Sequence, residues 1–329
     1  MSKARDLGSL INSTAAGKNF VINGDFNINQ RNATSTTSAW AFLADRWKTT
    51  SFSGSATWSI STIAENIFSN QTSNKAIRIT SSSSSNDHGF QQSMEDVRSL
   101  AGQTVTVSFW ARSSGTSYTV DLVELMQYFG SGGSANVYTY GSTSGKTITS
   151  SWSRLSFNIT LPSISGKTIG PGNYLNLRID PVTVLPSGEW IEITHVQLEA
   201  GSSATAFSLS SGDIQGELAK CQRYYQRMSG AGSGVIGSKN NATTTYFIVP
   251  LKVNMRSAPS MASSAVGELV LSALNGSTTY AATSFSSNRS SPWSASFGIG
   301  QGTSDGGTGD AGILLLDSAN GWVEFSAEL

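Results

Sequence analysis

The feature that most constrains the fold is a strict alternation of apolar and polar residues along several short stretches. The segment "LSFNITL" places four apolar residues, from Leu155 to Leu161, on one face and polar residues on the other, and "VTVSF" and "YLNLRID" repeat the pattern. Side chains alternate between the two faces of a β-strand, so this period indicates half-buried antiparallel strands. Clusters of Gly, Asn, Ser and Pro separate the stretches. Residues 18–210 are therefore predicted to form a jelly-roll β-sandwich.

The same period returns after residue 230, in "FIVPLKV" and in "GILLLDSANGWVEFSAEL". These segments predict a second, smaller β-sandwich over residues 230–329. Asn320-Gly321 lies between two apolar stretches, which is the strongest short signal for a β-hairpin. In the first domain, one short helix is expected at Met94–Leu100, closed by Gly102. The predicted fold class is all-β, with two sandwiches joined by one connector helix.

The connector helix is predicted over residues 211–229. Asp213 is a good N-cap, Gly230 lies just past the end, and apolar residues follow at spacings of four, three, four and three. These residues are Ile214, Leu218, Cys221, Tyr225 and Met228. The spacing is that of a coiled-coil seam, but about two heptads are too few to hold chains together alone. We expect the helix to be clamped between the two β domains near a trimer axis, with Cys221 as a small buried hydrophobe.

The first residues form a separate segment, 1–17, in which Leu7, Leu10 and Ile11 have helical spacing. Such a short helix does not persist alone in water. The segment is expected to anchor or dock the protein, and a frayed terminus is the alternative.

Charge and cysteine content exclude several classes of function. The chain of 329 residues has 21 basic and 21 acidic residues, and a net charge of zero argues against a nucleic-acid partner. A single cysteine excludes an intrachain disulfide and any zinc site built on several cysteines. No apolar run approaches the length of a membrane span and no signal peptide is recognisable, so we expect no membrane insertion and no export by this route.

Catalytic motifs are also missing. The two histidines, His88 and His195, are expected to be ordinary strand or loop residues, and no nucleophile-elbow motif is present. A glycosidase needs two carboxylates close together. The acidic pairs in the sequence are Glu95/Asp96, Asp121/Glu124 and Glu189/Glu192. None carries a recognisable signature, so we expect a protein that is not an enzyme.

Composition favours binding instead. Eight tryptophans and nine tyrosines accompany strands rich in Ser, Thr and Asn. Flat rings stack on sugar faces, and amides and hydroxyls bond the sugar hydroxyl groups, so this mixture suits a glycan surface. The candidate glycan-binding residues are Tyr118, Tyr128, Tyr138, Tyr140 and Trp190. For each aromatic residue, a position in the core is the alternative.

Several segments resemble a known family. "NFVINGDFNINQR" with "LADRW", "QQSMEDVRSLAGQTVTVSFWARSS", "QYFGSGGSANV", "SWSRLSFNITLPSISGKTIG" and "HVQLEAGSSATAF" look like the jelly-roll module in tail fibres and adhesion proteins of tailed bacteriophages. "GELAKCQRYYQRM" resembles the helix that follows this module, and "YFIVPLKVNMRSAPSM" with "FSAEL" resembles the distal β domain of such proteins. The resemblance is colinear and covers the chain from about Lys18.

The resemblance implies a virion protein of tail-fibre or receptor-binding type, usually homotrimeric, that attaches to a glycan on a bacterial surface without catalysis. Its amino-terminal segment would dock to other virion proteins, and the chain would be made in the host cytoplasm. The alternatives are a capsid decoration, head-fibre or purely structural tail protein, and a depolymerase acting on the glycan. A tail position is favoured over the capsid surface.

The jelly roll also resembles carbohydrate-binding modules, in which the start of the chain and an acidic residue of the last strand often hold a structural calcium. Here the last strand reads Ile193-Thr194-His195-Val196, without that acid. No cofactor and no metal site is therefore expected. Asp25 and Glu199 remain the candidate ligands for a structural calcium.

Overall fold

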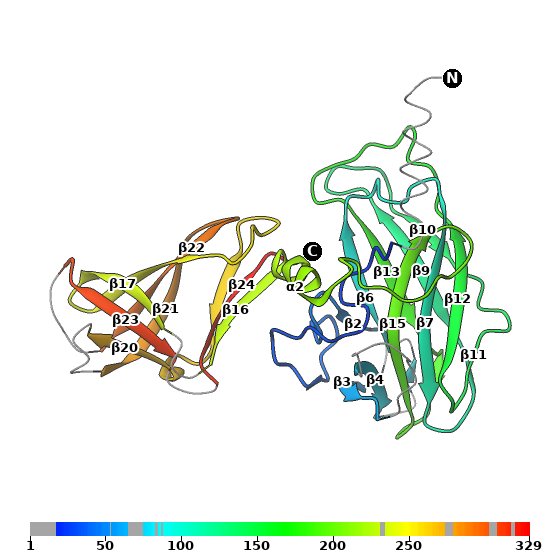
Figure 1. Cartoon of the computed structure of the whole chain (residues 1–329), viewed down its shortest axis with the longest axis horizontal. Helices are drawn as coiled ribbons and strands as arrows, with labels where there is room; N and C mark the ends of the chain where they lie inside the picture. The colour runs from blue at the N-terminus through cyan, green and yellow to red at the C-terminus, as the bar shows by residue number, and fades with distance from the viewer. Residues whose placement is uncertain are drawn as a thin grey trace. The chain divides into compact units, whose positions relative to one another are not determined.

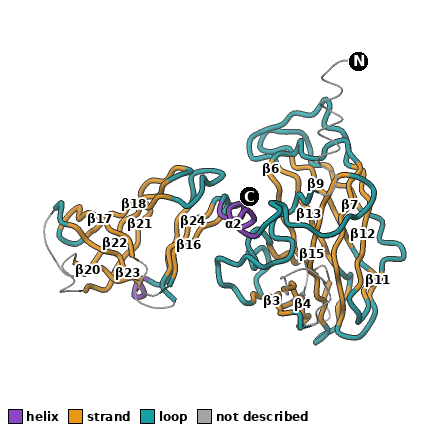
Figure 2. Tube along the Cα trace, viewed as in Figure 1, coloured by secondary structure: helices purple, strands orange, loops and turns teal. Residues whose placement is uncertain are grey.

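The computed structural model describes residues 18–52, 54–64, 75–82, 85–86, 88–230, 234–273, 279–302, 308–316 and 320–329. The predicted anchoring segment, residues 1–17, lies outside the described residues. The chain divides into two compact units, with the boundary between Leu218 and Ala219 (Figure 1). Figure 2 shows that strands make up nearly all the regular structure of both units, so the predicted all-β class is confirmed.

The N-terminal unit is a sandwich of two antiparallel sheets. The six-stranded sheet has the order β1 (Ser35–Thr36), β3 (Ala56–Thr62), β4 (Lys75–Ser81), β15 (Trp190–Ala200), β7 (Thr104–Ser113), β12 (Ser153–Thr160). The five-stranded sheet has the order β10 (Val137–Tyr140), β9 (Leu122–Tyr128), β13 (Tyr174–Asp180), β6 (His88–Glu95), β2 (Lys48–Ser51). Two short ladders, β8 (Tyr118–Thr119) with β11 (Thr147–Ile148) and β5 (Ser85–Asn86) with β14 (Val184–Leu185), complete the unit.

The alternating pattern of the sequence produces this core. Val107 and Phe109 of β7 and Leu175 and Leu177 of β13 are fully buried and belong to one continuous cluster. Residues between them on the same strands face outward. Each sheet therefore buries one apolar face against the other and turns a polar face outward, as a jelly roll requires.

The prediction of a helix at Met94–Leu100 is wrong. Strand β6 continues to Glu95, and the next residues form turns. Asp96 and Leu100 have positive φ values of 69° and 61°, as does Gly102 at 73°. Positive φ interrupts a right-handed helix, so the apolar spacing here serves a sequence of tight turns.

The predicted connector helix is shorter than expected. Helix α2 spans Ile214–Gln222, and Asp213 caps it, since its Oδ1 accepts from the Gly216 N–H at 2.8 Å. Tyr225–Ser229, predicted to be helical, is strand β16, which pairs with β24 (Trp322–Ser326). The backbone groups of β16 find partners in a distant strand, and this pairing overrides a local helical spacing.

The apolar residues that were predicted to line one side of the connector helix are therefore only partly buried. Cys221 and Tyr225 are buried, as expected for Cys221, whereas Ile214 is 50% exposed and Leu218 is 36% exposed. Within the N-terminal unit, Glu217 holds the start of α2: its carboxylate accepts from the Asn23 N–H at 2.6 Å and from Ser210 and Ser211. The clamped position of the helix between two domains stays a prediction.

The C-terminal unit is a closed barrel with an added sheet, not a second sandwich. The barrel has the order β17 (Gly234–Asn241), β18 (Thr244–Pro250), β22 (Ser294–Gln301), β21 (Thr279–Ser291), β20 (Leu269–Ala273), β23 (Ala311–Leu316). Strand β24 lies between β16 and β19 (Ser260–Ser263), and a short 3-10 helix, η1 (Val266–Glu268), precedes β20. Phe297 of the barrel and Phe325 of the added sheet share one core. The unit begins before residue 230, because β16 belongs to it.

The hairpin predicted at Asn320-Gly321 does not form between its flanking strands. Strand β23 pairs with β17 and β20 in the barrel, whereas β24 pairs with β16 and β19. A turn signal marks a change of direction, but the core decides which strands become neighbours.

Among the described residues, no helix has both the length and the apolar character needed to cross a membrane.

Candidate functional site

The outer face of the five-stranded sheet is the candidate functional surface. The strand register places one residue of each strand in a single transverse row: Tyr140, Glu124, Arg178, Gln91 and Lys48. Four strand spacings separate the ends of this row, which amounts to roughly 19 Å. The face is therefore wide enough for several sugar units side by side.

Exposed aromatic rings gather at both ends of this row. Tyr138 and Tyr140 on β10 are 50% and 56% exposed, and Trp40 and Phe52, beside β2, are 45% and 55% exposed. Among the described residues of the N-terminal unit, these four are the large aromatic side chains that solvent reaches most. An aromatic ring that the fold does not bury is available to a partner.

The end of the face at β10 is a tyrosine cluster. The rings of Tyr128 and Tyr174 lie 4.6 Å apart, centroid to centroid, at 30° to each other. Burial raises the pKa of Tyr174, and the neighbouring Tyr128 and Tyr138 raise it further. Four tyrosines from β9, β10 and β13 thus line one end of the face.

In the middle of the row, an arginine is held between a carboxylate and the ring of Phe52. Arg178 Nε donates to Asp180 Oδ1 at 3.1 Å, and Arg178 Nη2 donates to Asp180 Oδ2. The Arg178 guanidinium lies 4.1 Å from the centroid of Phe52, whose ring lies 5.5 Å from that of Trp40. Two parallel bonds to one carboxylate fix the guanidinium plane, so Phe52 rests on an ordered support.

A buried carboxylate lies between the two ends. Glu124 is 7% exposed and lies opposite Tyr140 in the strand register. Burial raises the pKa of Glu124, while Arg178 and the Tyr140 hydroxyl oppose the rise. The pKa of Tyr140 is raised by partial loss of hydration and by the same carboxylate. Tyr140 is the most exposed aromatic residue of the face.

Carboxamides beside the row add fixed hydrogen-bonding groups. Asn176 accepts from Ser93 Oγ at 3.0 Å and donates to Gln91 Oε1 at 3.3 Å. Both partners lie on β6, so the amide planes are set by neighbouring strands. Such groups recognise hydroxyl groups of a sugar while the rings contact its apolar face.

The structure unites three of the five predicted glycan-binding residues: Tyr128, Tyr138 and Tyr140. Tyr118 lies in the short β8–β11 ladder and packs against the core. Trp190 begins β15 of the other sheet, with the guanidinium groups of Arg78 and Arg112 over its ring at 4.3 and 5.6 Å. A glycan role for these two residues stays a prediction.

Sequence reasoning missed part of the face. Tyr174 lies four positions before Arg178 on the same strand, so both side chains point to the same face. This alternation could have identified Tyr174 as an outward residue from the sequence. Trp40 and Phe52 lie outside regular alternation, and no local pattern places them beside the sheet.

The two histidines occupy strand positions, as expected. His88 and His195 are both buried, and His195 lies at a bulge of β15 with a φ of 53°. Its ring stacks on Phe207 at 4.4 Å. Burial and the charge of Arg154 lower the pKa of His195 to about 4, so its imidazole is neutral at pH 7.

The candidate calcium ligands have structural partners. Glu199 accepts from the Thr205 N–H at 2.9 Å and from Gln197 Nε2 at 2.7 Å, and Asp25 accepts from Asn27 Nδ2 at 2.9 Å. Burial raises the pKa of Asp25. No cluster of three or more His, Cys, Asp or Glu residues suited to a metal lies within the described part of the chain.

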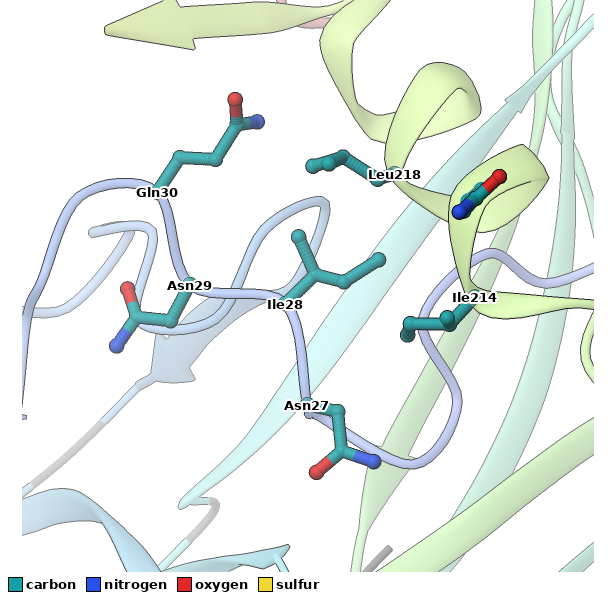
Figure 3. Close-up of a pocket in the computed structure, with 7 residues that line it drawn as sticks. Asn27, Ile28, Asn29, Gln30, Ile214 and Leu218 are labelled. Carbon is teal, nitrogen blue, oxygen red and sulfur yellow. The ribbon is translucent and has the colours of Figure 1, made fainter. Parts of the chain in front are cut away.

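A cavity of about 520 Å³ lies elsewhere in the same unit (Figure 3). It is lined by Asn27, Ile28, Asn29, Gln30, Ile214, Gln215 and Leu218. The aliphatic side chains of Ile28, Ile214 and Leu218 point toward one another across it. None of the lining residues is charged or aromatic, so the cavity offers no ring on which a sugar can stack.

Comparisons with known proteins leave the family open. No family model and no curated protein matches the chain. Solved structures that match part of the chain include an arabinose-bound MgGH51 α-L-arabinofuranosidase, at 13% identity and a TM-score of 0.34, covering 57% of this chain and 27% of that one. The chain thus matches about a quarter of that enzyme's length.

Two further structures match over nearly their whole length. The CBM22-1 xylan-binding domain of Xyn10C from Paenibacillus barcinonensis is 11% identical, with a TM-score of 0.31, and the match covers 52% of this chain and 98% of that domain. A cyclase from Fischerella sp. TAU is 13% identical, with a TM-score of 0.36, covering 57% of this chain and 98% of the cyclase. At these TM-scores the matches carry no argument about function.

Proposed function

We propose that the chain is a non-enzymatic glycan-binding protein, and that the outer face of the five-stranded sheet contacts the glycan. One observation carries this proposal. The exposed aromatic residues of the N-terminal unit, Trp40, Phe52, Tyr138 and Tyr140, all lie on or beside this face. Between them stand oriented carboxylate, guanidinium and carboxamide groups, which suit the hydroxyl groups of a sugar.

The biological setting is also a proposal and rests on the sequence resemblance alone. The chain is a bacteriophage virion structural protein of tail-fibre or receptor-binding type, and its glycan lies on the bacterial surface. It forms a homotrimer, docks to other virion proteins through residues 1–17 and is made in the host cytoplasm. Sedimentation of the purified protein and its position in purified virions test this setting. A monomer, or absence from the particle, contradicts it.

Binding is tested with surface polysaccharide extracted from susceptible bacteria, by affinity electrophoresis and calorimetry. Tyr138→Ala and Tyr140→Ala are expected to weaken binding about tenfold each, because each removes a ring of the face. Trp293→Ala is the matched control, since Trp293 is 63% exposed but lies in the C-terminal unit. Equal binding by all variants, or no binding by the wild type, contradicts the proposed surface.

One observation favours depolymerase activity as the second candidate function. Glu124 lies on the aromatic face, and its raised pKa is a property of general acids in glycoside hydrolysis. Incubation of the protein with the polysaccharide, followed by measurement of new reducing ends, separates the two functions. Reducing ends released by the wild type and abolished by Glu124→Gln identify an enzyme, whereas their absence with intact binding supports the non-enzymatic proposal.

A further inference from the structure

The charges on the outer face of the five-stranded sheet extend the proposed function, because they affect which glycans this face accepts. Outward charged residues in the described strands of this sheet are Glu124, Asp180 and Glu95 on the acidic side and Arg178 and Lys48 on the basic side. When all are ionised, the acids outnumber the bases by one. The balance is small, so the placement of each charge matters more than the sum.

Arg178, the cation in the middle of the row, is already paired with a carboxylate. Arg178 donates through Nε and Nη2 to the two carboxylate oxygens of Asp180, which is 1% exposed. Its side chain is 17% exposed and lies over Phe52. Arginine binds a carboxylate or phosphate best through this same two-bond fork, so Asp180 occupies the geometry that an acidic sugar would need.

The second cation is held at the margin. Lys48 lies on β2, the edge strand, with its ammonium group 6.0 Å from the centroid of Trp40 and 5.7 Å from that of Phe42. The distance across the row separates it from the tyrosine cluster on β10. A sugar stacked on Tyr138 and Tyr140 therefore has Glu124, rather than a cation, as its nearest charged group along the row.

Glu124 makes the middle of the face unfavourable for a second negative charge. It is a buried member of the row, and like charges repel more strongly where water is excluded. The strand register also sets this carboxylate opposite Tyr140, the most exposed ring of the face. A carboxylate, phosphate or sulfate on a bound sugar would face this group while Arg178 stays with Asp180.

We propose that this face selects uncharged glycans, with Glu124 and the Asp180–Arg178 pair as the residues that discriminate against acidic ones. The inference rests on the proposed glycan-binding function. It specifies the substrate class as neutral oligosaccharides rather than uronate, sialate or phosphate-bearing polymers. The side chains that contact the neutral sugar are then the tyrosine rings, with Asn176 and Gln91 as oriented polar groups.

The test is a panel of soluble polysaccharides at pH 7 and low salt. The neutral members are mannan, galactomannan, xylan, dextran and mixed-linked glucan, and the acidic members are alginate, polygalacturonate and polysialic acid. The wild type is expected to bind at least one neutral polymer and to bind acidic polymers at least about tenfold more weakly. Glu124→Gln, which keeps the side-chain shape, is expected to narrow that gap by raising affinity for acidic polymers.

Asp180→Asn gives a second measurement, because it weakens the fork on Arg178. It is expected to raise affinity for acidic polymers more than for neutral ones, so that the ratio of acidic to neutral affinity increases. Circular dichroism and thermal melts show whether this buried substitution retains the fold. Glu124→Gln keeps the test decisive if it does not.

The outcomes separate this inference from the function on which it rests. Binding of a neutral polymer that is lost in Tyr140→Ala, with acidic polymers excluded, supports both. Binding of an acidic polymer that is also lost in Tyr140→Ala overturns the charge selection but leaves the glycan surface standing. Absence of binding across the panel and the host polysaccharide contradicts both.

Discussion

The two outer faces of the N-terminal sandwich contain similar residue types but use them differently. On the six-stranded sheet, Arg78 and Arg112 both bind Glu192, which is fully buried, at 2.8 Å. Trp190 and Trp152 lie against these guanidinium groups, with Arg112 4.9 Å from the Trp152 centroid. On the five-stranded sheet, the tyrosine rings at β10 are at least half exposed.

The chain itself covers part of the first face. Thr205–Ser208 runs beside β15, where Ser208 N–H donates to Gln197 Oε1 at 2.9 Å and Phe207 stacks on His195. The contrast between the two faces shows that a large number of aromatic residues does not by itself identify a binding surface. Rings that serve internal ion pairs stabilise the fold, and rings left in solvent are available to a ligand.

The largest expected effect is on stability at Glu192. Glu192→Ala leaves two partly buried arginines without their shared carboxylate and is expected to lower the free energy of unfolding by about 3 kcal/mol. Urea unfolding monitored by tryptophan fluorescence measures this loss. A loss below about 0.5 kcal/mol would show that the ion pairs do not hold this face together.

His195 gives a pH-dependent effect on the same face. Its folded pKa, about 4, is below the ordinary value of 6.5, so its contribution to stability is present above pH 6.5 and is lost as pH falls through 4. The full contribution is at most about 3 kcal/mol. His195→Asn, which tolerates the positive φ, should unfold with a shallower pH dependence between 6.5 and 4. Identical slopes for the two proteins contradict the shifted pKa.

Paired substitutions of aromatic residues test the contrast directly. Trp190→Ala is expected to cost about 2 kcal/mol of stability because the ring packs on two guanidinium groups. If the outer face of the five-stranded sheet binds the glycan, this variant keeps its glycan affinity. Tyr140→Ala is expected to cost less than about 1 kcal/mol of stability but to weaken glycan binding. Unfolding curves and binding isotherms on both variants provide the comparison. Loss of binding in Trp190→Ala alone would move the site to the other sheet.

The smallest effect is expected at an exposed ion pair. Arg98 and Asp96 are 3.0 Å apart, with side chains 58% and 49% exposed. Asp96→Asn is expected to change stability by less than about 0.5 kcal/mol, because solvent screens an exposed pair. Asn also tolerates the positive φ of this position. Comparison of Asp96→Asn with Glu192→Ala shows how much more a buried, paired carboxylate contributes to stability than an exposed one.

Strand parity explains how much of the site was predictable. The alternation in "VYTY" and "YLNLRID" places Tyr138, Tyr140, Tyr174 and Arg178 on polar faces. It does not reveal that β10, β9 and β13 are neighbours, because paired residues such as Arg178 of β13 and Glu124 of β9 lie more than fifty positions apart in the chain. Trp40 and Phe52 reach the face from loops, where no period exists. For Trp190 the alternation correctly indicates an outward side chain, but that side chain packs on the ion pairs of the six-stranded sheet and not on the proposed glycan surface.

The sequence by itself determined the all-β class, the apolar faces of the strands and the Asp213 cap, because these depend on side-chain period and local backbone bonds. Only the tertiary structure decided that Tyr225–Ser229 is a strand, that the C-terminal strands close into a barrel and which aromatic rings stay exposed. Strand pairing and burial depend on partners far away in the chain. Their free energy exceeds the local preferences that a short stretch of sequence records.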